Sequence, residues 1–194
     1  AEVDNLVWRD GERIRSNPRR ARIDNLDDLP YPAYDKLPGY PQRYHLPLFS
    51  YVKRLGASMI TSRGCPFTCS FCDRTVFEHK YRYNSAPYIH EHMRYLRDRF
   101  GVHHVNFYDD LFTANRKRIH ELCELLIAKP LGMNFNCAIR AGQDDAEMFR
   151  KLKAAGALMV SMGIESADPV MMERHKAGVT CDEVRATVRD IHAA

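Results

Sequence analysis

The most informative part of this sequence is Thr61-Ser62-Arg63-Gly64-Cys65-Pro66-Phe67-Thr68-Cys69-Ser70-Phe71-Cys72. It places Cys65, Cys69 and Cys72 in the spacing C-x3-C-x2-C, directly after the short apolar run at 58–61. Three thiolates so close together are typical of a metal centre, and an iron–sulfur cluster held by three protein ligands keeps one position open for chemistry. The spacing therefore favours an iron–sulfur cluster at these three cysteines.

Other uses of the cysteines remain open at this point. A structural zinc site could recruit His79 as a fourth ligand, although zinc modules normally bring two ligand pairs and a second Cys-x2-Cys pair is absent. A disulfide framework is not expected, because 194 residues can build a core without covalent staples. We interpret Cys123, Cys137 and Cys181 as small buried apolar residues.

From residue 58 onward the hydrophobic pattern alternates between strands and helices. The expected strands are 58–63, 105–108, 133–139 and 158–163. Helices are expected after caps at Ser85 and Thr113, from about Asp144 to Ala155, from Asp168-Pro169 to near Gly178, and after a capping box formed by Thr180 and Glu183. In the last helix, Val184, Val188 and Ile191 are expected to face inward. Four successive strand–helix units predict an α/β fold with parallel strands and right-handed crossovers.

Polar side chains follow each expected strand at its carboxyl end. The cysteine stretch follows the first strand, Asp109 and Asp110 the second, Arg140 the third, and Glu165 with Ser166 the fourth. Because chemistry in parallel barrels collects at the strand C-termini, we expect these groups to share one site. Structural alternatives exist: the two aspartates could favour a helix N-terminus, and Glu165 could pair with a cation such as Arg140.

The rest of the composition is that of an ordinary globular protein, with 45% hydrophobic and 28% charged residues and a net charge of +4. Residues 1–57 hold six of the ten prolines and read as an irregular extension, with a hairpin around Asp10-Gly11. The basic segment 13–22 could touch phosphates, but a solvated loop is the interpretation we favour. No apolar run approaches the ~18 residues that span a bilayer, so no transmembrane segment is expected.

Residues 61–72 resemble the cluster loop of the radical S-adenosylmethionine (SAM) superfamily. The resemblance implies that Cys65, Cys69 and Cys72 hold a [4Fe-4S] cluster whose free iron binds the amino and carboxylate groups of SAM. It places Phe71 near the adenine. The implied activity is reductive cleavage of SAM to methionine and a 5′-deoxyadenosyl radical, which takes hydrogen from a substrate.

Two further segments resemble parts of that superfamily. Residues 109–113 resemble the Asp-Asp-x-Phe-Thr variant of the cobalamin-dependent subgroup, which implies that Asp109 or Asp110 accepts from the SAM ammonium. Residues 163–166 resemble the Gly-Ile-Glu-Ser segment of the fourth strand, which implies contacts of Glu165 and Ser166 with SAM. Arg140 is a candidate for the SAM carboxylate.

The connector at 22–35 resembles the bridge between the cobalamin-binding domain and the barrel in B12-binding radical SAM proteins, among them methyltransferases and the anaerobic magnesium-protoporphyrin ester cyclase. We therefore expect residues 1–57 to be a linker from a preceding domain and 58–194 to be the N-terminal part of a (βα)6-type barrel, truncated after about four units. The Asp-x-His-x-x-Gly motif that grips cobalamin does not occur in the sequence, so cobalamin is expected only in a longer parent chain.

Together these resemblances predict a radical SAM enzyme that drives methylation or oxidative cyclisation of a small or lipid-like metabolite. An electron donor such as flavodoxin or ferredoxin and a reducing cytoplasm are implied, and nucleic acid is not the expected partner. The fragment itself is expected to be weakly active or inactive. A radical SAM methylthiotransferase acting on tRNA or protein and a zinc-stabilised nucleic-acid-binding module are the alternatives.

Overall fold

The computed structural model describes residues 3–18, 20, 22–46, 55–73, 75–77, 80–176 and 178–194. Its centre is a four-stranded sheet in which every neighbouring pair is parallel, in the order β3-β6-β7-β8. These strands are β3 (Gly56–Met59), β6 (His104–Phe107), β7 (Asn134–Ile139) and β8 (Ala157–Met162). The predicted succession of parallel strand–helix units is therefore confirmed.

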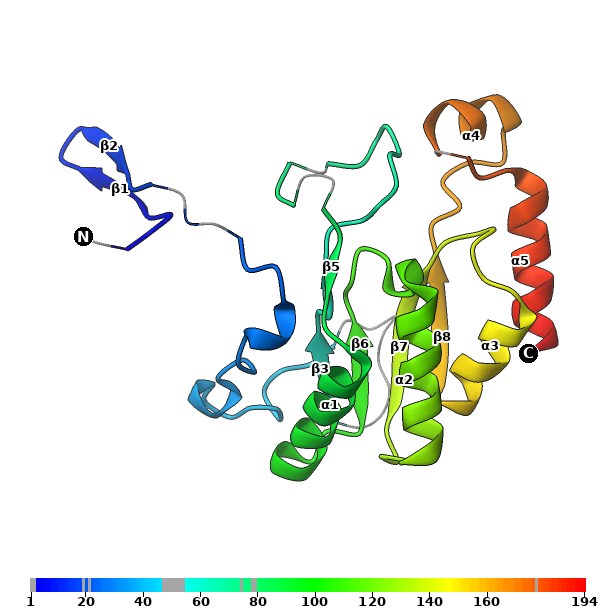
Figure 1. Ribbon diagram of the computed structural model, residues 1–194, viewed down its shortest axis with the longest axis horizontal. Helices are drawn as coiled ribbons and strands as arrows, with labels where there is room; N and C mark the ends of the chain where they lie inside the picture. Colours follow the sequence, from blue (N-terminus) through cyan, green and yellow to red (C-terminus); the bar gives the residue numbers. More distant parts are fainter. Residues whose placement is uncertain are drawn as a thin grey trace.

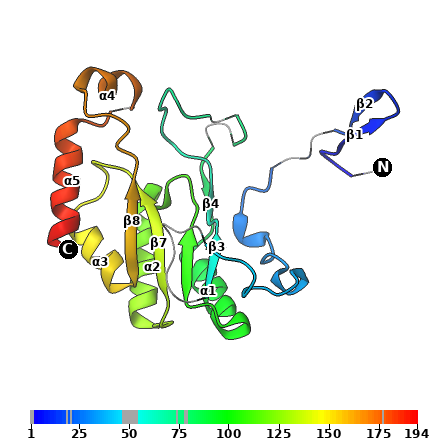
Figure 2. The same ribbon diagram turned by 180° about the vertical axis from the view of Figure 1, so that it is seen from behind.

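The helices that connect consecutive strands pack on one face of this sheet, as Figures 1 and 2 show, whereas the two helices after the last strand lie above its carboxyl edge and beside the last connecting helix. The helices are α1 (Ala86–Phe100), α2 (Arg116–Ala128), α3 (Ala146–Ala154), α4 (Pro169–His175) and α5 (Cys181–Ala193). The strands and the long helices run so that the cysteine loop and α4 both stand at the carboxyl edge of the sheet, at the top of Figure 1.

The hydrophobic core lies between the sheet and the helices. Alternate strand residues such as Val105 and Phe135 are fully buried against helix residues such as Ile89 and Leu122. This alternation places the intervening polar residues on the other face of the sheet. Cys123 and Cys137 are buried in the core as expected, whereas Cys181 is only partly buried at the start of α5.

Three local predictions were wrong. The expected strand at 58–63 is two strands, because β3 ends at Met59 and Ser62–Arg63 forms β4, which pairs antiparallel with β5 (Arg82–Tyr83). Helix α2 is capped by Asn115 rather than Thr113, which lies in the short 3-10 helix Phe112–Ala114. In α5 the buried position beside Val184 belongs to Thr187, while Val188 is 36% exposed.

The N-terminal extension begins with the expected hairpin, β1 (Val7–Asp10) and β2 (Arg13–Ser16), and continues through short 3-10 helices at Leu26–Asp28 and Tyr34–Lys36. The second part of this extension packs on α1. The Tyr34 hydroxyl lies 3.1 Å from His92 Nε2, and the ring of Tyr31 stacks on His92 with 4.2 Å between centroids.

Within the described residues, no helix has both the length and the apolar character that crossing a membrane requires.

Candidate functional site

The base of the cysteine loop is a tight two-strand clamp. β4 and β5 pair Ser62 with Tyr83 and Arg63 with Arg82, and the loop leaves this clamp through Gly64. Gly64 has φ +83°, and a Cβ there would lie 2.6 Å from the Lys80 carbonyl oxygen. Only glycine tolerates both conditions, so this position fixes the direction in which the chain enters the loop.

Asp109 is the group that holds the clamp to the sheet. Its side chain is fully buried, and its carboxylate accepts from Thr61 N and Thr61 Oγ1 at 2.5 Å each and from Ser62 N at 2.8 Å. Arg118, 2% exposed, lies 3.9 Å from Asp109 and donates to the Thr61 carbonyl at 3.1 Å. Asp109 therefore positions the start of the loop.

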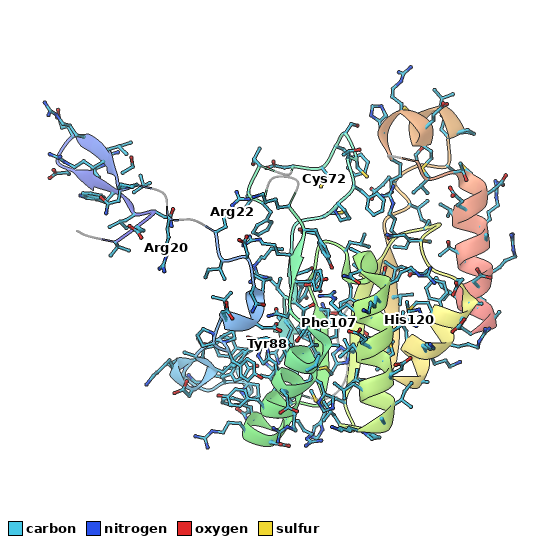
Figure 3. All side chains as sticks on the ribbon, viewed as in Figure 1. Arg20, Arg22, Cys72, Tyr88, Phe107 and His120 are labelled. Carbon is cyan, nitrogen blue, oxygen red and sulfur yellow. The ribbon has the colours of Figure 1, made fainter. Side chains whose placement is uncertain are left out.

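The three cysteines of the loop are free thiols with different surroundings. Cys69 is buried, Cys65 is partly buried and Cys72 is exposed. Cys65 and Cys72 line one cavity of about 220 Å³ together with Asp110. Burial raises the pKa of the Cys65 thiol, and the nearby Asp110 carboxylate raises it further. Figure 3 shows Cys72 on the loop above the sheet.

Arg140 reaches the loop from the end of β7. Its Nη1 lies 3.4 Å from Cys69 Sγ, its Nη2 donates to the Lys176 carbonyl at 2.7 Å, and its guanidinium stacks on the Phe67 ring at 4.0 Å. Arg140 is 9% exposed. This arrangement puts a positive charge against the buried cysteine and ties the loop to the segment after α4.

Lys176, which the sequence pattern did not indicate as a site residue, contacts both Glu165 and Phe71. Lys176 is buried, its Nζ lies 3.3 Å from Glu165 Oε1, and the same Nζ stands 5.4 Å over the Phe71 ring. The structural alternative, a pairing of Glu165 with a neighbouring cation, is therefore what the structure shows, with Lys176 as that cation. Glu165 also adopts φ +68°, a left-handed conformation that is uncommon outside glycine and often marks functional sites.

Helix α4 also holds the loop directly. Ser70 N donates to the His175 carbonyl at 3.1 Å, and Ser70 Oγ lies 2.6 Å from His175 Nδ1. Ser166 is used within its own segment, where its Oγ accepts from Asp168 N at 3.1 Å at the start of α4. The segment after β8 thus folds back over the cysteine loop.

The donor set fits an iron–sulfur cluster. Each thiolate of a [4Fe-4S] cluster binds a different iron, so its ligands surround a body of several atoms and need not meet at one point. Cys65, Cys69 and Cys72 occupy one loop, and in the described part of the chain no three His, Cys, Asp or Glu side chains are grouped closely enough for a single metal ion. His79, the conceivable fourth zinc ligand, falls outside the described residues.

Residues 59–194 match the model of the radical SAM superfamily. The chain belongs to the radical SAM superfamily. The predicted family is thereby confirmed, the chain is that of an enzyme, and the alternative of a zinc-stabilised nucleic-acid-binding module is not retained.

Curated relatives of this radical SAM chain include proteins named as methyltransferases and cyclases. It is 30% identical over 176 residues to an uncharacterised methyltransferase of Pyrococcus horikoshii, covering 90% of this chain and 37% of the relative. It is 29% identical over 197 residues to the anaerobic magnesium-protoporphyrin IX monomethyl ester cyclase of Cereibacter sphaeroides, covering 100% of this chain and 31% of the relative. The chain spans about a third of the length of these relatives. Their names are those of the predicted subgroup, so this resemblance is confirmed too.

Solved structures give the same fold. The cobalamin-dependent S-adenosylmethionine radical enzyme OxsB, solved with aqua-cobalamin and S-adenosylmethionine bound, superposes with a TM-score of 0.73 at 22% identity, covering 99% of this chain and 28% of that chain. The radical S-adenosylmethionine methyltransferase TsrM from Kitasatospora setae, with cobalamin and a [4Fe-4S] cluster bound, gives 0.62 at 20% identity over 72% of this chain and 29% of that chain. The predicted partial radical SAM barrel is the fold observed.

Several contacts of the site were not predicted from the sequence. Lys176 and His175 lie at the end of the short helix α4, which also carries Arg174. Nothing in the sequence distinguishes the basic residues that contact the cysteine loop from the one that does not. Phe67 and Arg118 carry no signal beyond aromatic or basic character. The spacing of Thr61 before Gly64 could have indicated a buried hydroxyl at the base of the loop, but not its partner Asp109.

Proposed function

We propose that this chain is the cluster-binding core of a cobalamin-dependent radical SAM enzyme. The observation that carries the proposal is the meeting of two segments at the carboxyl edge of the sheet. The loop with Cys65, Cys69 and Cys72 lies against the segment that carries Glu165 and Lys176. A ligand bound at the cysteines would therefore lie beside a carboxylate and an ammonium group.

Cys65, Cys69 and Cys72 would hold a [4Fe-4S] cluster in this site. With SAM bound, that cluster supplies one-electron cleavage of SAM to methionine and a 5′-deoxyadenosyl radical. Arg140 places its guanidinium 3.4 Å from Cys69 Sγ and so puts a positive charge beside this ligand. The buried side of Cys69 and the ring of Phe67 keep water from that part of the loop.

Residues from different segments at the carboxyl edge of the sheet are proposed to contact different parts of SAM. Asp110 is exposed in the cavity beside Cys65 and can accept from the methionyl ammonium, whereas both oxygens of Asp109 are already used by Thr61 and Ser62. Lys176 can donate to the methionyl carboxylate, because Arg140 is committed to the loop. Phe71, 55% exposed, offers a ring face for adenine.

Glu165 and Ser166 are proposed to serve the ribose. A carboxylate can accept from both hydroxyls of a ribose diol, and Glu165 Oε1 is held at 3.3 Å by Lys176. Because Glu165 is 46% exposed on its side chain, it remains open to a ligand from solvent. Ser166 would act by shaping the turn into α4.

The assignment to the cobalamin-dependent subgroup rests on the names of the relatives and on the share of their length that this chain covers. The chain covers 37% and 31% of two relatives named as a methyltransferase and a cyclase. We propose that residues 1–57 link an upstream cobalamin-binding domain to the barrel, and that the full-length protein methylates or oxidatively cyclises a small or lipid-like metabolite. A flavodoxin or ferredoxin would supply the electron, and the cytoplasm provides the reducing conditions. The methylthiotransferase alternative stays a prediction that the full-length sequence would test.

The proposal is tested by loading the purified protein with iron and sulfide under anaerobic conditions. We expect about four iron atoms per chain and a broad visible absorbance. Cys65→Ser should lower the iron content, whereas Cys123→Ser, a core cysteine outside the loop, should leave it unchanged. Stoichiometric zinc with no uptake of iron would contradict the proposal.

Lys176 gives a test of the SAM contacts. In the loaded protein, Lys176→Met should weaken SAM binding about tenfold, as expected for the loss of a charge-assisted hydrogen bond. Lys176→Arg should retain most of the affinity. Lys153→Met, which removes an exposed cation of α3 far in sequence from the loop, is the control. Equal affinity of Lys176→Met and wild type would exclude this assignment.

A further inference from the structure

Arg140 contacts one of the three proposed cluster ligands directly. It follows β7 at the carboxyl edge of the sheet, and its Nη1 donates a hydrogen bond to Cys69 Sγ at 3.4 Å. A side chain that only fastened the loop could do so through the loop backbone. This one reaches the sulfur atom itself, so its effect on that ligand is electrostatic as well as mechanical.

Other contacts fix the direction of the Arg140 guanidinium. Its Nη2 donates to the Lys176 carbonyl at 2.7 Å, and its plane lies over the Phe67 ring with 4.0 Å to the centroid. The residue is only 9% exposed. Because the guanidinium is planar and held on two further sides, its Nη1 stays directed at the sulfur and does not turn to solvent.

The ligand that Arg140 contacts is the most buried of the three. Cys69 is 8% exposed, whereas Cys65 is partly buried and Cys72 is exposed. A hydrogen bond is electrostatically stronger in a region of low dielectric than in water. The donor therefore acts on the one thiol of the loop where solvent weakens it least.

Glu183 is an acidic side chain that responds to Arg140. Hydrogen bonds from Thr180 lower the pKa of the Glu183 carboxyl group, and the charge of Arg140 lowers it further. The Glu183 carboxylate accepts from Thr180 N at 2.7 Å and from Thr180 Oγ1 at 2.8 Å, so it remains part of the capping box of α5. Arg140 thus interacts with Glu183 at longer range while its Nη1 donates to Cys69.

We propose that Arg140 sets the reduction potential of the cluster by donating a hydrogen bond to the Cys69 thiolate. This role rests on the proposed function, because it requires a [4Fe-4S] cluster at the three cysteines. One electron from a reduced flavodoxin or ferredoxin makes the cluster more negative. A charged donor at a ligand sulfur stabilises that reduced form over the oxidised form, and so raises the potential. Arg140 would therefore determine which low-potential donors can reduce the cluster.

The sign of the shift separates this role from a purely structural one. Loss of the Arg140 donor lowers the potential. If Arg140 served only to pack against Phe67, its loss would admit water to Cys69. Water also stabilises the more negative form of the cluster, so that change would raise the potential.

The test is an EPR-monitored potentiometric titration of the reconstituted protein without SAM. At the potential that reduces half of the wild-type clusters, the ratio of reduced to oxidised cluster should fall about tenfold in Arg140→Met, as expected for the loss of a hydrogen bond to a charged acceptor. Arg140→Gln, which also lacks the guanidinium, should change the ratio in the same direction. Arg174→Met, which removes an exposed cation from α4, is the control and should stay within about twofold of wild type.

Iron content and thermal unfolding of each variant make the outcomes distinct. No iron uptake by wild type would overturn the cluster site, and this role with it. A wild-type cluster whose potential is unchanged or raised in Arg140→Met would overturn the role of Arg140 alone, and Arg140→Gln decides if Arg140→Met holds no iron. Two Arg140 variants that fold but take up no iron would assign Arg140 to cluster assembly instead. An equal fall in Arg174→Met would assign the effect to net charge, and either result overturns the proposed role.

Discussion

At the scale of single residues, Asp109 and Asp110 are neighbours in sequence with opposite surroundings. Asp109 is 4% exposed and accepts three hydrogen bonds from Thr61 and Ser62, while Asp110 is exposed in the cavity beside Cys65. Strand alternation at the end of β6 turns one carboxylate inward and the next toward the loop. Asp109 therefore positions the loop, whereas Asp110 is the aspartate proposed to bind a ligand.

Asp109→Asn should destabilise the protein by about 3 kcal/mol. The change leaves the buried Arg118 without its anionic partner and places an amide donor against the Thr61 hydroxyl. Equilibrium unfolding in urea measures the loss. Asp110→Asn is the matched control, with a change within about 0.5 kcal/mol, because Asp110 is exposed. Equal stabilities of the two variants would show that Asp109 does not hold the loop.

Asp144 predicts a pH-dependent stability. Its side chain is buried, and burial raises its pKa more than the nearby Thr113 hydroxyl lowers it. The folded protein then keeps this proton to a higher pH than the unfolded chain, so stability falls as pH rises through the folded-state pKa. Asp144→Asn should be more stable than wild type at pH 7, by on the order of 1 kcal/mol.

The difference between wild type and Asp144→Asn should vanish below about pH 3, where the carboxyl group is protonated in both states. Urea unfolding of the cluster-free protein at several pH values measures it. Asp145→Asn is the control, because hydrogen bonds from the Met148 backbone and from Arg116 lower the pKa of Asp145. That variant should instead lose stability at pH 7. A pH-independent difference for Asp144→Asn would contradict the account.

At the scale of elements, the caps and the strand ends were the predictable part. Ser85, Asp168 and Thr180 cap α1, α4 and α5 as the sequence indicates, because capping depends on residues close in sequence. Because polar groups collect at strand C-termini, Arg140 and Glu165 were expected near the cysteine loop. Arg140 contacts Cys69, and Glu165 contacts Lys176. Such local signals are sufficient wherever neighbouring residues decide the conformation.

Contacts between distant elements were beyond this reasoning. The break between β3 and β4 arises because the backbone of Thr61 and Ser62 bonds to a side chain 47 or 48 residues away, Asp109. The contact of His175 with Ser70 spans 105 residues. Neither pairing is encoded in a spacing, since each depends on how the segment after β6 or β8 folds back over the loop.

Helix α2 offers a test of the observed cap. Asn115 Oδ1 accepts from Arg118 N at 3.1 Å, so Asn115→Ala should cost about 1 kcal/mol in urea unfolding. Thr113→Val should cost less, because the first turn of α2 donates to Asn115 and not to the Thr113 hydroxyl. A larger loss for Thr113→Val than for Asn115→Ala would restore Thr113 as the cap.

At the scale of the whole molecule, the site depends on three parts of the chain. The extension packs on α1 through Tyr31 and Tyr34, the sheet supplies Asp109 and Arg140, and the segment after β8 supplies Lys176. Figure 1 shows the cysteine loop and the segment after β8 at the upper edge of the sheet, and the extension beside α1 at the lower left. The central claim is that the loop and this edge together bind a cluster with SAM at its open position.

The most direct measurement of that claim is the EPR spectrum of the reconstituted, reduced protein with and without SAM. We expect a signal from a reduced [4Fe-4S] cluster whose g-values shift when SAM is added, because SAM binds the iron that no cysteine holds. Lys176→Met should need more SAM for the same shift. A cluster signal that SAM leaves unchanged at saturating concentration, or a protein that takes up no iron, would contradict the account.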